Sequence, residues 1–114
     1  MSKDLRSYLD ELLEKRPKDV VVVDKEVDPK YEASGIVEKF ERENKFPLVF
    51  FKNIKGSKIP LVINLGATYE RLALSLGSPS VPQMVKDLAH REHHPLPVKE
   101  ISVKDAPCKE VILK

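Results

Sequence analysis

The chain has 114 residues, of which 41% are hydrophobic, and its 20 basic and 18 acidic residues leave a net charge of +2. This length suits one domain with a modest core and excludes a cofactor-binding domain together with an independent second domain. The balanced charge excludes the basic footprint that is typical of nucleic-acid-binding proteins.

Three further features bear on the cellular compartment. The single cysteine, Cys108, cannot form an internal disulfide, which favours a reducing environment. The start of the chain carries Asp4 and no apolar run of the signal-peptide type. No stretch of about 18 apolar residues occurs, so no membrane span is expected. We therefore expect a cytoplasmic protein.

The first predicted element is a helix that Ser2 or Asp4 would cap and that ends before Pro17. Apolar residues recur on one face of it at helical spacing. These residues are Leu5, Tyr8, Leu9, Leu12 and Leu13. The β-branched run 20–23 follows, and its continuous apolar character predicts a strand that is buried on both faces.

Asp28-Pro29 predicts the start of a second helix, because aspartate accepts hydrogen bonds from free backbone amides and proline has no amide to leave unpaired. The expected buried stripe of this helix is Ala33, Ile36, Val37 and Phe40. The polar stretch 41–44 then ends the helix.

A hairpin is predicted next. The apolar run 48–51 predicts a central strand, and residues 59–63 predict its partner. Asn53 and Gly56 lie between them, and both residue types tolerate the positive φ of a tight turn. Pro60 lacks an amide donor, which places the start of the second strand at an edge or a bulge.

Two helices and two short β-rich segments complete the predicted elements. Thr68 would cap a helix over 69–76 that Gly77 ends. A further helix begins at 81 and ends near His93, with the apolar stripe Val81, Met84, Val85 and Leu88. After Pro95 the pattern predicts β-rich segments at 98–103 and 108–113.

The alternation of strands and helices predicts an α/β fold, with α+β as the alternative, in which three or four strands pack with about four helices. We expect residues 1–94 to form this domain and residues 95–114 to form connector strands. The chain ends just after the apolar residues 111–113, so we expect Lys114 to be a boundary within a longer protein.

The sharpest chemical cluster is the stretch 90–94, where His90 and His94 stand one helical turn apart. That spacing could hold a metal, but no acidic or cysteine ligand is evident elsewhere, and histidines at a helix end also interact favourably with the helix dipole. The cluster is therefore interpreted as a surface helix end. Cys108 is interpreted as a small apolar residue of a strand.

Charged residues elsewhere give weaker signals. Lys52, Lys55 and Lys58 surround the predicted hairpin turn and would form at most a weak anion patch, because the spacing fits no phosphate loop. The pairs Asp10/Glu14 and Glu38/Arg42 are expected on solvated helix faces. No serine stands in the glycine-flanked context of a nucleophile elbow. We assign no catalytic, cofactor-binding or metal-ligating residue in this chain.

Taken together, several short motifs resemble the start of the UbiD family of decarboxylases, the polyprenyl-hydroxybenzoate carboxy-lyases and their relatives. Their order and spacing carry the resemblance, which covers nearly the whole chain. The motifs are Asp4 to Leu9, Glu26 to Pro29, Phe51 to Gly56, Pro60, Asn64 to Gly66, Arg71 to Gly77, Pro95 to Pro97 and Asp105 to Glu110.

The resemblance implies the N-terminal scaffold domain of a non-oxidative decarboxylase of aromatic or α,β-unsaturated carboxylic acids. Members of the family use prenylated FMN with manganese and potassium, held by a following split-barrel domain. The partners implied are this flavin-binding domain and the C-terminal domain of the same enzyme, which forms a homo-oligomer when full length. The 114-residue chain alone is expected to be inactive and to bind no cofactor. The alternative is a stand-alone, non-catalytic interaction module or small subunit.

Overall fold

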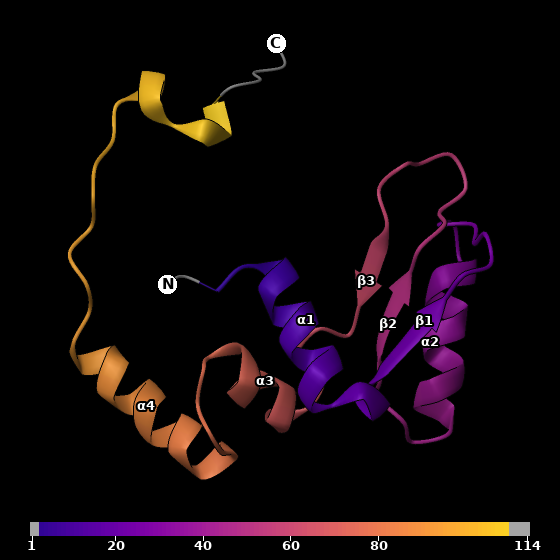
Figure 1. Cartoon of the computed structure of the whole chain (residues 1–114), viewed down its shortest axis with the longest axis horizontal. Coiled ribbons are helices and arrows are strands. Elements are labelled where there is room, and N and C mark those ends of the chain that lie inside the picture. The colour runs from indigo at the N-terminus through magenta and orange to yellow at the C-terminus, as the bar shows by residue number, and fades with distance from the viewer. Residues whose placement is uncertain (1–2, 110–114) are drawn as a thin grey trace.

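The structure is a computed structural model that describes residues 3–109. It contains a three-stranded mixed sheet, in the strand order β1-β2-β3 (Figure 1). The first pair of strands is parallel and the second is antiparallel. The strands are β1 (Val20–Val23), β2 (Leu48–Phe51) and β3 (Leu61–Ile63), and the α-helices are α1 (Leu5–Lys15), α2 (Glu32–Arg42), α3 (Tyr69–Ser75) and α4 (Val81–His93). The predicted α/β class and the central position of residues 48–51 are confirmed.

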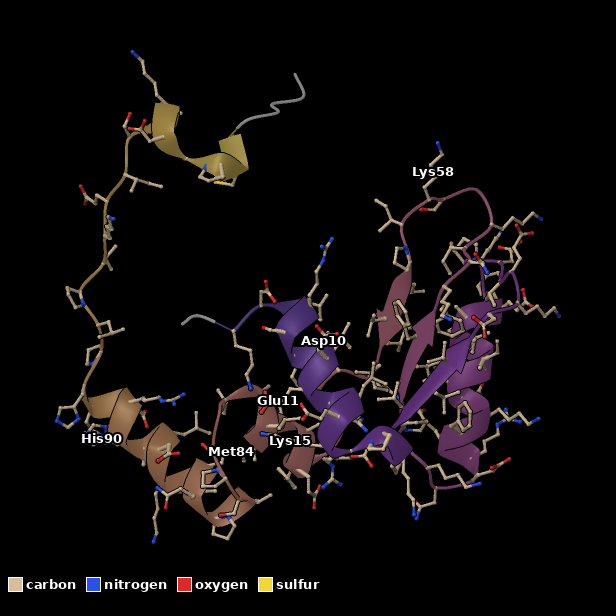
Figure 2. All side chains as sticks on the ribbon, viewed as in Figure 1. Asp10, Glu11, Lys15, Lys58, Met84 and His90 are labelled. Atoms are coloured by element: carbon tan, nitrogen blue, oxygen red, sulfur yellow. The ribbon has the colours of Figure 1, made fainter. Side chains whose placement is uncertain are left out.

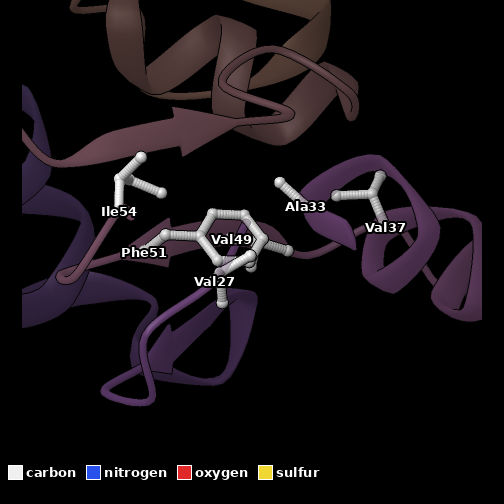
Figure 3. Packing of buried hydrophobic residues seen from close by; sticks show 6 residues of the cluster. All are labelled: Val27, Ala33, Val37, Val49, Phe51 and Ile54. Atoms are coloured by element: carbon white, nitrogen blue, oxygen red, sulfur yellow. The ribbon is translucent and has the colours of Figure 1, made fainter. Parts of the chain in front are cut away.

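Helix α2 covers one face of the sheet. Its residues Ala33 and Val37 are buried against Val49 and Phe51 of β2, and Val27 and Ile54 complete the cluster (Figure 3). Ile36 and Phe40 pack at its margin, so the predicted stripe of this helix is confirmed. Successive side chains of a strand point to opposite faces, which leaves Leu48 and Phe50 for the other side.

Helices α1 and α3 cover that other face. Tyr8 and Leu12 of α1 are buried together with Leu48, and Leu74 of α3 packs against the same cluster. The cap of α1 is Asp4, whose carboxylate accepts a hydrogen bond from the amide of Ser7 at 2.8 Å, as one of the two predicted caps. The outer residues of the predicted stripe, Leu5 and Leu13, are exposed.

The prediction that residues 20–23 are buried on both faces is wrong. Among the described residues, strand β1 pairs only with β2, so it lies at an edge of the described sheet. Val20 packs against the α1 cluster, whereas Val22 remains 41% exposed. A β-branched run can thus indicate a strand while saying little about how many elements cover it.

The second helix begins three residues later than Asp28-Pro29 predicted. Asp28 accepts from the amide of Lys30 at 2.8 Å, which forms a local turn in place of a helix cap. Tyr31 then adopts a left-handed conformation with φ 71°, and a right-handed helix cannot pass through such a residue. The helix therefore starts at Glu32.

The predicted hairpin is confirmed, and its turn is made by Gly56 and not by Asn53. The amide of Ser57 donates to the carbonyl of Ile54 at 3.1 Å, and Gly56 has φ +77° at the third position of this four-residue turn. Asn53 instead donates its side-chain amide to the carbonyl of Asp24 at 2.5 Å. Strand β3 starts directly after Pro60, at the sheet edge that the proline predicted.

The ends of the last two helices agree with the sequence. Thr68 caps α3 through the amide of Arg71, and Gly77 follows the helix with φ +72°. Ser80 caps α4 through the amide of Gln83 at 3.3 Å. Every helix within residues 3–109 is too short or too polar to serve as a membrane span.

The β-rich segments predicted after Pro95 are wrong wherever the structure describes the chain. Residues 95–102 form neither helix nor strand, and single 3₁₀ turns follow at Val103–Asp105 and Pro107–Lys109. Figure 1 shows this stretch running away from the sheet, so it has no neighbouring strand with which to pair. The predicted apolar end at 111–113 lies outside the described residues.

Candidate functional site

Helix α4 is attached to the rest of the domain by few contacts. Met84 is its one buried residue, at 4% exposure. Asp87 accepts a hydrogen bond from the hydroxyl of Ser78 at 2.6 Å and another from the side-chain amide of Gln83 at 2.8 Å. These bonds hold the pKa of Asp87 below its ordinary value, with the Ser78 hydroxyl as the largest cause. The carboxylate thus ties α4 to the loop that follows α3.

Two of the four residues in the apolar stripe of α4 are largely exposed in the described chain. The predicted stripe consists of Val81, Met84, Val85 and Leu88, and of these Val85 is 59% exposed and Leu88 44% exposed. The prediction of the helix is confirmed, and the spacing of its apolar residues is that of a helix that faces a core. An apolar stripe without cover is a common sign of an interface.

The segment that follows α4 extends this uncovered surface. Leu96 and Val98 are 90% and 91% exposed, on backbone that lies away from the sheet (Figure 1). We call the whole set of exposed apolar side chains on α4 and this segment the uncovered face. Its members are Val85, Leu88, Leu96, Val98, Ile101 and Val103.

The histidine cluster lies at the exposed end of α4 (Figure 2). The rings of His90 and His94 stack with their centroids 4.2 Å apart. Nδ1 of His94 lies 2.8 Å from the carbonyl oxygen of His90, and Nδ1 of His93 lies equally close to that of Ala89. Within residues 3–109, no three His, Cys, Asp or Glu side chains come together in a metal-binding arrangement. The contacts of these rings with carbonyl oxygens of the last helical turn are those of residues at a helix C-terminus.

The hairpin lysines are largely paired with carboxylates. Lys52 lies 2.7 Å from Asp24, and Lys55 lies 3.5 Å from Asp28. Lys58 stands at the tip of the hairpin, on the opposite side of the molecule from His90 (Figure 2). The structure therefore does not gather the three lysines into an anion site.

The remaining predicted groups lie at the surface. Glu38 and Arg42 form an exposed ion pair at 2.7 Å, as their spacing on the helix indicated. Asp10 is exposed on α1, next to Glu11, which pairs with Lys15 at 2.7 Å (Figure 2). Cys108 is exposed within a 3₁₀ turn, so its interpretation as a strand residue is wrong.

Arg71 is the feature whose role sequence reasoning missed. Its side chain is 1% exposed, and Nη2 donates to the carbonyl oxygens of Phe46 at 2.6 Å and Asn64 at 3.0 Å. Phe46 precedes β2 and Asn64 follows β3, so the guanidinium joins the two strands at one end of the hairpin. Burial lowers the pKa of Arg71, because a buried charge loses its hydration. In the sequence, Arg71 stands three residues before Leu74, and this spacing places both side chains on the buried face of α3. That spacing is the signal from which its burial could have been predicted.

The chain also matches a known family. Residues 11–91 match the family model described as the 3-octaprenyl-4-hydroxybenzoate carboxy-lyase N-terminal domain. The chain belongs to this UbiD N-terminal domain family. The resemblance stated from the sequence motifs is thereby confirmed.

Two curated relatives of this UbiD domain are decarboxylases. One is the anhydromevalonate phosphate decarboxylase of Methanothermobacter thermautotrophicus, 32% identical over 97 residues that make up 85% of this chain and 21% of the relative. The other is the phenolic acid decarboxylase of Sedimentibacter hydroxybenzoicus, 33% identical over 117 residues, which cover 97% of this chain and 24% of the relative. The chain thus spans less than a quarter of the length of either relative.

Solved structures agree with the UbiD fold. The vanillic acid decarboxylase of Sedimentibacter hydroxybenzoicus in its closed form matches with a TM-score of 0.72 at 30% identity, over 97% of this chain and 24% of that chain. An evolved dimeric form of the UbiD-class enzyme HmfF from Pelotomaculum thermopropionicum, in complex with prFMN, matches with a TM-score of 0.69 at 31% identity, over 93% of this chain and 23% of that chain.

Proposed function

We propose that this UbiD domain is the N-terminal scaffold of a non-oxidative decarboxylase that acts on aromatic or α,β-unsaturated carboxylic acids with prenylated FMN. Within that enzyme, residues 1–94 form the domain and residues 95–114 lead towards the flavin-binding domain. The proposal places the enzyme in the cytoplasm and makes it a homo-oligomer when full length. The 114 residues alone are inactive.

The observation that carries this proposal is the uncovered face on a chain that matches about a quarter of each relative. Val85 and Leu88 expose apolar surface at helical spacing, and the segment after α4 exposes more. Apolar surface that stays in contact with water raises the free energy of the protein by about 25 cal/mol for each Å², compared with the same surface when buried. Packing of the flavin-binding domain against α4 would remove that cost.

The described residues do not fit the cofactor. The family's cofactor is a flavin held with a divalent and a monovalent cation, and such cations need several oxygen ligands around one point. Residues 3–109 bring no three metal-ligating side chains together, and the glycines at 56 and 77 serve turn and helix-end geometry. The contribution of this chain to the enzyme would be to support the flavin-binding domain.

The test of the proposal is spectroscopic and catalytic. The 114-residue chain, produced in cells that make prenylated FMN, should purify without flavin absorbance and should release no CO₂ from aromatic acids. A chain that copurifies with prenylated flavin in stoichiometric amount would contradict the division of labour between domains.

In the alternative, a stand-alone interaction module or small subunit, the same uncovered face would bind a partner protein. The DNA downstream of the codon for Lys114 discriminates between the two functions. An open reading frame that continues into a flavin-binding domain supports the scaffold. A stop codon immediately after Lys114 would favour the separate module.

A further inference from the structure

Helix α4 contacts the rest of the domain through one stripe of residues, two of which are charged. Met84 is 4% exposed, and Asp87 accepts a hydrogen bond from the hydroxyl of Ser78 at 2.6 Å. Nη2 of Arg91 donates to the carbonyl oxygen of Leu76 at 3.2 Å. Positions 84, 87 and 91 are spaced by three and four residues, so they lie on one side of the helix. We call these three residues the inner stripe.

Val85 and Leu88 lie on a different side of α4. Because a helix turns by about 100° per residue, the middle of this pair stands about 100° around the helix axis from the middle of the inner stripe. Their exposed fractions, 59% and 44%, agree with that position. The helix therefore meets the domain with two charged side chains and one apolar one, while two apolar side chains stay in water. An amphipathic helix usually has the opposite orientation.

Space for the usual orientation exists beside α3. A cavity of about 300 Å³ lies between the end of α1, α3 and the start of α4. Ala73 and Leu74 of α3 line it, and so does Val81, the first residue of the apolar stripe of α4. A rotation of α4 that turned this stripe towards α3 would bury apolar surface, which is favourable in water. The observed orientation therefore requires interactions that oppose the rotation.

The polar bonds of the inner stripe supply that opposition. Ser78 is 7% exposed, so its hydroxyl would lose its partner if Asp87 turned away. A buried hydroxyl without a partner is costly, and hydrogen bonds that involve a carboxylate or a guanidinium are stronger than those between neutral groups. Arg91 adds a second bond one helical turn further along, to Leu76 at the C-cap of α3. Two anchors one turn apart resist rotation about the helix axis.

We propose that Asp87 and Arg91 are positioning residues that fix the rotation of α4 about its axis, and that they thereby hold Val85 and Leu88 outward for the flavin-binding domain. The outward direction of the apolar stripe is set by specific polar bonds, at the expense of burial against α3. The identity of the partner rests on the proposed function. The orientation itself is a property of this chain and can be measured without the partner.

The test is the rate at which N-ethylmaleimide alkylates cysteines placed on α4 of the 114-residue chain. Met84→Cys, Val85→Cys and Leu88→Cys are made one at a time, and the exposed Cys108 serves as the internal reference. Positions 85 and 88 should react about as fast as Cys108, and position 84 about tenfold more slowly, because a thiol reacts only where reagent reaches it.

The same three cysteines are then placed in the background Asp87→Ala/Arg91→Ala. Positions 85 and 88 should now react about fivefold or more slowly, and position 84 faster, because the apolar stripe has turned towards α3. The matched control is Lys86→Ala/Glu92→Ala, which also removes one cation and one anion from α4 but leaves the inner stripe intact. Its three rates should equal those of the parent.

Two outcomes would overturn the proposal. Unchanged rates at 85 and 88 would show that the inner stripe does not set the orientation. Fast reaction at all three positions would show that it only attaches α4 to the domain. NMR contacts between the methyl groups of Leu88 and Leu74 give a second readout that needs no added cysteine. They should be absent in the parent and present in Asp87→Ala/Arg91→Ala, and their absence from that variant would contradict the rotation.

The partner is tested separately in the full-length enzyme. Alkylation of Val85→Cys should fall about tenfold there relative to the 114-residue chain, because the flavin-binding domain covers the position. Equal rates in the two proteins would overturn the assignment of the partner, whatever the rates in the 114-residue chain show about the orientation of α4. Flavin binding by the 114-residue chain, the outcome that contradicts the scaffold function, is a different observation, so failures of the two proposals are distinguishable.

Discussion

The layer formed by α2 and the helix α4 differ in how their apolar stripes are used. On α2, Ala33 and Val37 are buried against β2, and the cluster reaches 0% exposure at Phe51. On α4, Met84 is buried while Val85 and Leu88 remain largely exposed. The first region is stabilised by the chain itself. The second has the apolar spacing of a core helix but little cover within the described chain, which supports the proposal that another part of the protein packs against it.

The largest expected effect is in the α2 layer. Phe51→Ala removes a fully buried ring between the sheet and α2, and it should lower the free energy of unfolding by about 3–5 kcal/mol. Urea denaturation followed by circular dichroism measures this change. A loss below about 1 kcal/mol would contradict the central position of this cluster.

A smaller loss is expected at the buried arginine. Arg71→Met keeps a long apolar stem but leaves the carbonyls of Phe46 and Asn64 without their donor, so stability should fall by about 2–3 kcal/mol. The matched control is Arg42→Met, which removes only the exposed pair with Glu38 and should change stability by less than about 0.5 kcal/mol. Equal effects of the two substitutions would show that Arg71 is not a structural clamp.

Acid should loosen α4 before it unfolds the sheet. Hydrogen bonds from Ser78 and Gln83 lower the pKa of Asp87 in the folded state from its ordinary value of 3.8. A group with a lowered folded pKa contributes stability that is present above the unfolded value and lost as the pH falls through the folded one. The methyl NMR signal of Met84 should therefore broaden or shift below about pH 4.

The variant Asp87→Asn provides the control for this pH dependence. Its Met84 signal should already be perturbed at pH 7 and should change little on acidification. A wild-type signal that stays constant down to pH 2 would show that Asp87 does not hold α4 in place.

The smallest effect is expected on the uncovered face. The double substitution Val85→Ser and Leu88→Ser should change the stability of the isolated chain by less than about 0.5 kcal/mol, because neither side chain is buried. The contrasting substitution is Met84→Ser on the same helix, which should cost about 2 kcal/mol or more. A loss of similar size in both variants would mean that the exposed stripe is packed in solution.

The sequence predicted most elements of this domain because each carried its own local signal. Thr68 and Gly77 marked the ends of α3, and Gly56 marked the hairpin. The local sequence pattern does not determine whether other elements pack over the apolar side of a strand or helix. The valines 20–23 formed the predicted strand but lie at an edge, and the stripe of α4 formed the predicted helix but lies exposed.

The candidate sites were harder to predict than the elements. The role of Arg71 was not predicted, because the two carbonyl oxygens that accept its hydrogen bonds belong to residues that stand 7 and 25 positions before it in the sequence. The β-rich pattern after Pro95 failed for a related reason, since a strand requires a neighbouring strand and the described chain offers none there.

Amide hydrogen exchange of the 114-residue chain tests the contrast between the two regions most directly. We predict that amides of α2 and β2 exchange only through global unfolding, whereas those of α4 exchange through a local opening that is at least tenfold more frequent. Equal protection of α4 and β2 would show that α4 belongs to the same cooperative core as the sheet. It would contradict the proposal that another part of the protein packs against the apolar face of α4.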